Sequence, residues 1–119
     1  TGVTLHRRSL MRVQAEFGTR TGDFGSVLYL GGPPLDDATA QAGFALSWGH
    51  VQTGANGITA LANVAGGPGS FTGSAVTWAD SLDAMMAASA DSYADPEIQE
   101  AIASSGMQVL GRVITRRLF

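Results

Sequence analysis

Residues 74–93 read SAVTWADSLDAMMAASADSY, and this stretch decides which fold the sequence predicts. Its large apolar side chains recur at steps of three and four residues, interrupted only by a small serine, which is the spacing of one face of an α-helix. Ser74 stands where an N-cap residue belongs. The pattern therefore predicts one helix over 74–93, with a seam of large side chains made by Trp78, Leu82, Met85 and Tyr93.

The residues that follow this stretch predict a second helix. Asp95-Pro96-Glu97 combines an N-cap residue, a proline at the first helical position and an early acid. Gly106 ends the apolar pattern and marks the end of this helix. The remaining tail, residues 107–119, fits either a helix or a strand, and the strand alternative is best over 112–115.

The N-terminal half contains two further helical patterns. Leu10, Val13 and Phe17 recur at helical steps and predict an amphipathic helix over about 4–17. Residues 25–30 fit a short strand as well as a helix. Asp36 and the acid after it suit an N-cap and a first turn, which predicts a helix to about residue 48. The conformation of residues 49–65 is left undecided.

These patterns together predict a mainly α protein, as a helical hairpin or a small helical bundle with glycine-rich loops. The length of 119 residues suits one domain over 1–119. Glycines and prolines interrupt the chain at 31–34 and 66–73, where we expect breaks. The alternative is an α+β fold with short strands near 25–30 and 112–115.

Composition and charge exclude several classes of protein. The chain has no Cys, which excludes disulfides and thiolate chemistry, and it has no apolar run long enough to span a membrane. All seven basic residues are arginines near the two ends, and nine of the ten acids lie between residues 21 and 111. This distribution disfavours nucleic-acid binding. It predicts an oligomer or a complex with a protein partner, in which the arginine-rich end of one chain, with Arg112, Arg116 and Arg117, contacts the acidic middle of another.

No stretch of the sequence predicts catalysis. His6 and His50 lack neighbouring partners for a catalytic or metal-binding role, and Asp80 and Asp83 suit a solvated helix face. The glycine-rich segment 67–73 has neither the spacing of a phosphate-binding loop nor that of a nucleophile elbow. The sequence therefore predicts a protein that is not an enzyme, with no catalytic residue, no metal and no cofactor.

Three features resemble a known family. Residues 17–24 place an aromatic side chain before a Gly-Asp pair and an apolar residue, and Trp48 follows an alanine-rich predicted helix. Tyr93 and Glu97 have the Tyr-x-x-x-Asp/Glu spacing of an export signal. Together these features resemble the small helical-hairpin substrates of type VII secretion, the Trp-Xaa-Gly and related actinobacterial families.

The resemblance implies a protein that does no catalysis and pairs with a partner hairpin. It implies that Tyr93 and Glu97 face the export ATPase and that the folded chain is secreted without a cleaved signal peptide. The residues expected in the partner contact or the core seam are Phe17, Phe24, Trp48, Trp78, Leu82 and Met85.

An alternative function is a structural subunit of a virion or another assembly, such as a bacteriophage head, neck or tail component. The segregated charges, the glycine-rich loops and the apolar end Leu118-Phe119 favour this alternative.

Overall fold

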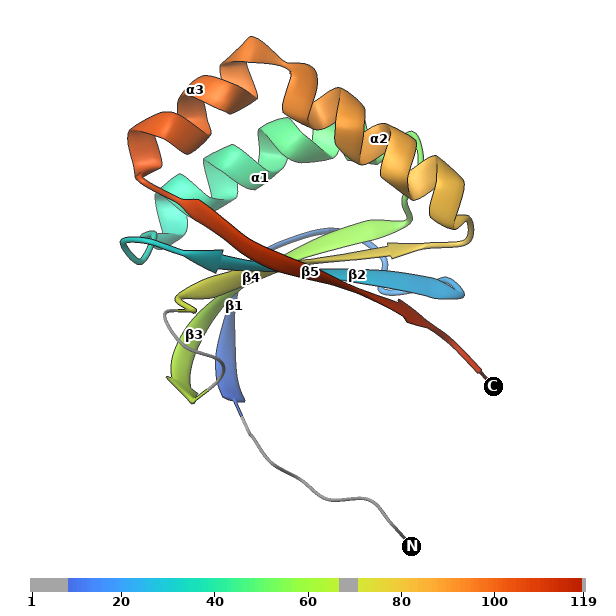
Figure 1. Ribbon diagram of the computed structural model, residues 1–119, viewed down its shortest axis with the longest axis horizontal. Coiled ribbons are helices and arrows are strands. Elements are labelled where there is room, and N and C mark those ends of the chain that lie inside the picture. The colour runs from blue at the N-terminus through green and yellow to red at the C-terminus, as the bar shows by residue number, and fades with distance from the viewer. Residues whose placement is uncertain (1–8, 67–70, 119) are drawn as a thin grey trace, which may run out of the picture.

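The computed structural model describes residues 9–66 and 71–118, which form five strands and three helices (Figure 1). In chain order the elements are β1 (Ser9–Gly18), β2 (Phe24–Gly31), α1 (Asp37–Val51), β3 (Gly57–Gly66), β4 (Gly73–Ala79), α2 (Leu82–Ala94), α3 (Pro96–Ser105) and β5 (Gln108–Arg116).

The five strands form one antiparallel sheet in the order β1-β3-β4-β2-β5. From β2 to β5 the chain follows a β-α-β-β-α-β succession, with α2 and α3 together in the place of the second helix. Strands β2 and β3 run parallel with β4 between them, which is a split β-α-β arrangement. Strand β1 extends this unit by pairing with the outer edge of β3.

The three helices cover one face of the sheet (Figure 1). Alternate strand residues face them, among them Leu28 and Leu30 of β2 and Ala75 of β4. Six of the twelve buried apolar residues in the described ranges are alanines, and Met85 is the largest side chain that is fully buried. Alanine side chains fill little of the space between a helix layer and a sheet, so a core rich in alanine leaves part of that space unfilled.

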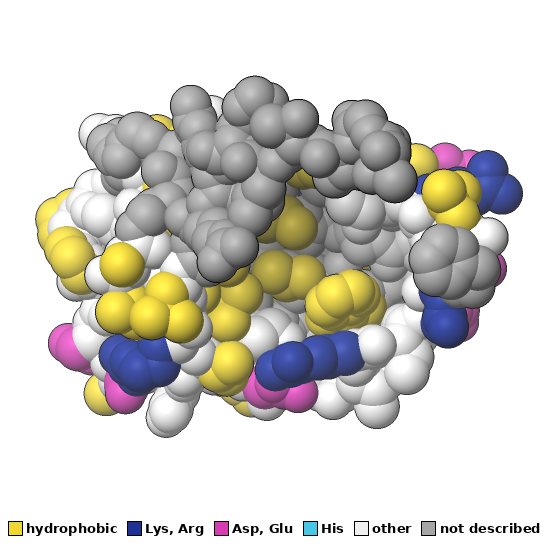
Figure 2. All heavy atoms as spheres, turned by 90° about the horizontal axis from the view of Figure 1, so that it is seen from below, with side chains coloured by type: hydrophobic (Ala, Val, Ile, Leu, Met, Phe, Trp, Pro, Cys, Tyr) yellow, Lys and Arg dark blue, Asp and Glu magenta, His cyan; other side chains and the backbone are white. Residues whose placement is uncertain are grey.

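The other face of the sheet carries no helix (Figure 1). Figure 2 shows this face, on which apolar side chains gather over the strands. The strand register places Val13 and Leu61 opposite each other here, and Val27 opposite Val76. Phe71 is buried against Tyr29 with their rings edge to face and their centroids 5.2 Å apart. The face is therefore apolar in its middle.

Side-chain caps fix where the helices begin. Asp36 accepts a hydrogen bond from the Thr39 amide at 2.7 Å, and Asp95 accepts one from the Glu97 amide at 2.9 Å. The helices predicted after residue 36 and after residue 95 are confirmed, and Gly106 ends the second of them with a φ of 71°.

The predicted mainly α fold is wrong, and the helix predicted over 74–93 is the principal error. Residues 73–79 are strand β4, and the helix begins only at Leu82, with Ser81 as its N-cap. The step of four from Trp78 to Leu82 therefore crosses from a strand to a helix. The helix-facing positions Ala75 and Ala79 are alanines, which favour helices over strands and so obscured the β-branched pair Val76 and Thr77.

The helix predicted over 4–17 is also wrong where the structure describes it, because residues 9–18 form β1. Two irregularities in its pairing with β3, after Leu10 and after Val13, shift the strand by a residue each. The first adds Val64 to β3, and the second adds Gln14 to β1, where it interrupts the two-residue alternation between Val13 and Phe17. Residues 4–8 of the predicted helix lie outside the described ranges.

The α+β alternative is the class that the structure has. Its two expected strands, 25–30 and 112–115, lie inside β2 and β5. The undecided segment 49–65 holds the end of α1 and most of β3. The break at 31–34 separates β2 from α1, and part of the break at 66–73 lies outside the described residues.

Candidate functional site: a cavity between the helices and the sheet

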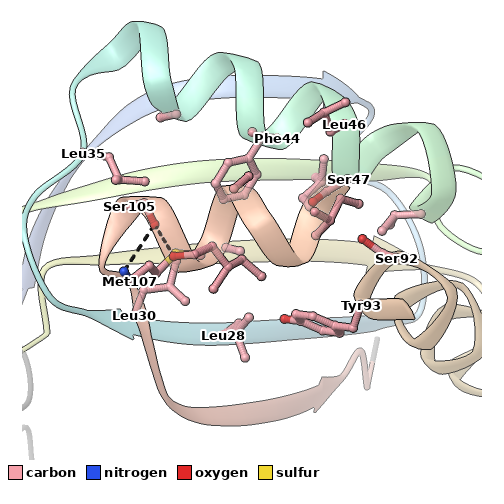
Figure 3. Close-up of a pocket in the computed structure, with 18 of the residues that line it drawn as sticks. Leu28, Leu30, Leu35, Phe44, Leu46, Ser47, Ser92, Tyr93, Ser105 and Met107 are labelled. Atoms are coloured by element: carbon pink, nitrogen blue, oxygen red, sulfur yellow. Dashed lines mark hydrogen bonds between the residues drawn. The ribbon is translucent and has the colours of Figure 1, made fainter. Parts of the chain in front are cut away.

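A cavity of about 560 Å³ lies between the helix layer and the sheet (Figure 3). Strands β2 and β4 form its floor, α1 forms one wall, and α2 and α3 form the other. Its lining is mainly apolar. The larger apolar residues that line it are Leu28, Leu30, Leu35, Phe44, Leu46, Val51, Ile58, Ile98, Ile102 and Met107.

Small residues on α1 keep this space open. Ala38, Ala42 and Gly43 line the cavity from that helix, and Ala75 lines it from β4. A Cβ atom added to Gly43 would meet no other atom within 4 Å. The alanine-rich helix predicted from the sequence therefore lines an unfilled volume.

Three buried hydroxyl groups line the cavity. Ser26 and Thr77 lie opposite each other on β2 and β4, and Ser92, labelled in Figure 3, lines the cavity from α2. All three side chains are at least nine-tenths buried, and none makes a side-chain hydrogen bond to residues 9–66 or 71–118. These three groups are therefore available to a molecule inside the cavity.

Arg112 is the one charged residue among the described residues that line the cavity. It lies opposite Leu28 in the pairing of β5 with β2, and its Nη1 donates to the Met86 sulfur of α2 at 3.3 Å. The ion pairs within the described ranges are Arg12–Asp37, Arg20–Glu16 and His50–Asp95. The Arg112 guanidinium takes part in none of them.

A histidine–aspartate pair ties the helices together beside the cavity. His50 Nε2, near the end of α1, lies 2.8 Å from Asp95 Oδ2 at the junction of α2 and α3. The hydrogen bond from His50, followed by the bond from the Glu97 amide, holds the pKa of Asp95 below its ordinary value. Neither side chain lines the cavity, although Val51 and Tyr93 next to them do. The sequence did not predict this pair, which connects α1 to the junction of α2 and α3.

The two residues of the expected export signal lie on different helices. Tyr93 is near the end of α2, lines the cavity and remains 39% exposed. Glu97 is in the first turn of α3 and is exposed. Pro96 lies between them and is the first residue of α3, so the two side chains do not share one helix face.

The other expected contact residues lie on five different elements. Met85 is fully buried on α2, where Leu82 is only half-buried, and Trp78 belongs to β4. The remaining three lie on other elements: Phe17 on β1, Phe24 on β2 and Trp48 on α1.

The three C-terminal arginines have different surroundings. Arg112 lines the cavity, whereas Arg116 lies 6.0 Å from the centre of the Phe24 ring. The backbone amide of Arg117 donates to the Asp23 carbonyl. They do not form one basic patch around a common site.

Within residues 9–66 and 71–118, no group of three or more His, Asp or Glu side chains is arranged to hold a metal ion. None of the helices described is long and apolar enough to cross a membrane. The fold and the cavity define a small α+β domain with an apolar cavity between its helices and its sheet. The chain matches no protein-family model, and comparison with curated proteins and with solved structures finds no similar protein.

Proposed function

We propose that this protein binds a small, largely apolar molecule in the cavity between its helices and its sheet. The observation that carries the proposal is the cavity itself. Its volume of about 560 Å³ falls in the range of about 300–1,000 Å³ typical of ligand sites, and its lining is apolar with a few polar groups. The unpaired hydroxyls of Ser26, Thr77 and Ser92 would orient the ligand by hydrogen bonds.

The lining favours binding over catalysis. Its hydroxyl groups have no histidine or carboxylate beside them to act as a general base, because His50 and Asp95 pair with each other outside the lining. A hydroxyl without such a base is a weak nucleophile. We therefore propose a binding protein, in keeping with the expectation that the chain is not an enzyme.

Calorimetric titration with decan-1-ol tests this function. The alcohol has an apolar chain and one hydroxyl, which match the cavity, and it carries no charge. We expect saturable binding with one molecule per chain. Gly43→Phe should weaken the binding at least tenfold, because the new ring would occupy the cavity. Absence of saturable binding by both decan-1-ol and decanoate would contradict the proposed function.

We propose self-association as a second function, supported by the edge strand β5. Strand β5 pairs with β2 along one of its two edges, and no described strand pairs with the other edge. Its exposed apolar residues are Val109, Leu110, Val113 and Ile114. Such an unpaired edge favours pairing with another strand. The proposed occupant is β1 of a second copy, since β1 is the opposite edge of the same sheet and pairs on one side only, with β3, among the described residues.

Light scattering after size-exclusion chromatography tests this association. Repeated pairing of β5 with β1 would give a ring or an open chain of subunits rather than a two-fold dimer. We expect assemblies larger than a dimer that Val113→Lys converts to monomers, because a lysine on an edge strand opposes pairing. A wild-type chain that stays monomeric at high concentration would contradict the proposal.

The two cellular roles expected from the sequence remain proposals. The resemblance to type VII secretion substrates implied a helical hairpin, which this fold is not, so export rests on the spacing of Tyr93 and Glu97. A head-to-tail assembly is what a virion subunit would require, and the exposed edge of β5 is compatible with that role.

A further inference from the structure

We infer that the ligand of the cavity is an amphiphile whose anionic head group, a carboxylate or a phosphate, pairs with Arg112; this inference rests on the proposed function. The described lining contains no acidic residue, and Arg112 forms no ion pair with residues 9–66 or 71–118. A guanidinium beside apolar side chains is stabilised most by an anion, because it donates two parallel hydrogen bonds to a carboxylate or a phosphate.

The position of Arg112 determines where the head group would lie. Arg112 and Leu28 face each other across the β2–β5 pairing and both line the cavity. Figure 3 shows the Tyr93 ring reaching from α2 over β2 toward Leu28, and the Tyr93 hydroxyl has no hydrogen bond to the described residues. A head group held by Arg112 would therefore lie close to a second hydrogen-bond donor.

The rest of the cavity fits an apolar tail. From Leu28 the lining continues along β2 to Leu30 and then to Leu35 and Met107 (Figure 3), and Ile102 of α3 also lines the cavity. No charged side chain is found along this path among the described residues. A flexible hydrocarbon chain attached to an anionic head matches this arrangement better than a molecule with charges at both ends.

Arg116 provides a matched control. It lies on the same strand as Arg112, four residues further on, but its guanidinium carbon lies 6.0 Å from the centre of the Phe24 ring and the residue is not part of the cavity lining. The inference requires that the preference for an anion depend on Arg112 and not on the positive charge of β5 in general.

Calorimetry with three probes of equal chain length, decanoate, decyl phosphate and decan-1-ol, tests the inference. At low salt we expect at least one anion to bind the wild-type chain about tenfold or more tightly than the alcohol, and the tighter anion identifies the head group. Arg112→Gln should remove this preference, so that the anions bind that variant no more tightly than the alcohol does, and Arg116→Gln should retain it. Circular dichroism verifies that both variants are folded.

The outcomes separate the inference from the function on which it rests. Equal binding of the alcohol and both anions by the wild-type chain would overturn the anionic head group but leave the apolar site intact. Failure of all three probes to bind would overturn both. An anion preference that survives Arg112→Gln, or is lost equally in Arg116→Gln, would also overturn the inference. If Arg112→Gln does not fold, Arg112→Lys replaces it, with a preference reduced but not lost.

Discussion

Gly43 offers the sharpest test of whether the cavity is a functional space. It lies within α1, lines the cavity, and has no atom within 4 Å of the position where a Cβ would be added. Gly43→Ala should therefore meet no clash. It should raise the free energy of unfolding by about 1 kcal/mol, because glycine is that much less favourable than alanine inside a helix. For a domain of this size the gain corresponds to a melting temperature about 4 °C higher.

Gly43→Phe extends the same change into the cavity. The aromatic ring would occupy space that the ligand needs, so we expect a folded protein whose unfolding free energy is within about 1 kcal/mol of the wild type. Binding of decan-1-ol, followed by calorimetry, should weaken at least tenfold. Thermal unfolding by circular dichroism reports the stability of the same samples.

Gly49→Phe is the matched control. Gly49 lies on the same helix and also has no atom within 4 Å of an added Cβ, but it does not line the cavity. Its substitution should leave binding unchanged. Wild-type affinity in Gly43→Phe, or an equal loss of affinity in both phenylalanine variants, would refute the reasoning that places the ligand beside α1.

Three further predictions concern stability. Met85→Ala should lower the free energy of unfolding by about 2–5 kcal/mol in a urea titration, because Met85 is fully buried, whereas Met86→Ala should cost less than about 1 kcal/mol; equal losses would contradict the assigned core. Gly54→Ala should cost about 1–3 kcal/mol, because the new Cβ would overlap the Ala84 carbonyl oxygen, and an unchanged melting temperature would show that this close approach is absent. The pKa of Asp95 is lowered in the folded state by His50 and the Glu97 amide, so its contribution to stability is present above the unfolded pKa of about 4 and is lost as the pH falls further. Unfolding measured from pH 6 to pH 2.5 should show this loss and a shallower one in Asp95→Asn, and equal slopes would contradict it.

The helices that sequence analysis predicted correctly are those whose signals are local. The carboxylates of Asp36 and Asp95 cap the amides two or three residues ahead, and Pro96 and Gly106 set the ends of α3. Such signals depend only on nearby residues and are readable without knowledge of the fold.

The strands were misread because their patterns depend on partners far away in the sequence. The spacing of Leu10, Val13 and Phe17 fits a helix, although the segment is extended and pairs irregularly with β3. In β4, small inner residues suit a sheet only because α1 and α2 lie above it. In these segments tertiary packing determines the secondary structure and overrides the local preference of the sequence.

The candidate site was also beyond the reach of the sequence. Its hydroxyls come from β2, β4 and α2, and only the strand order brings them together. The richness in alanine and glycine with few aromatic residues was visible, and in retrospect it is the signal of an underfilled core. Arg112 was singled out for its charge, but nothing near it in the sequence indicates that it lines a cavity.

An amide-resolved NMR titration of the wild-type chain with decanoate tests the central claim most directly. Binding in the cavity predicts saturable shifts of the Leu28, Gly43 and Ser92 amides, which belong to three elements around it. The amides of Val13 and Val64, in β1 and β3, should shift little, because neither residue lines the cavity. Shifts confined to β1 and β3, or no saturable shift at Leu28, Gly43 and Ser92, would contradict the account.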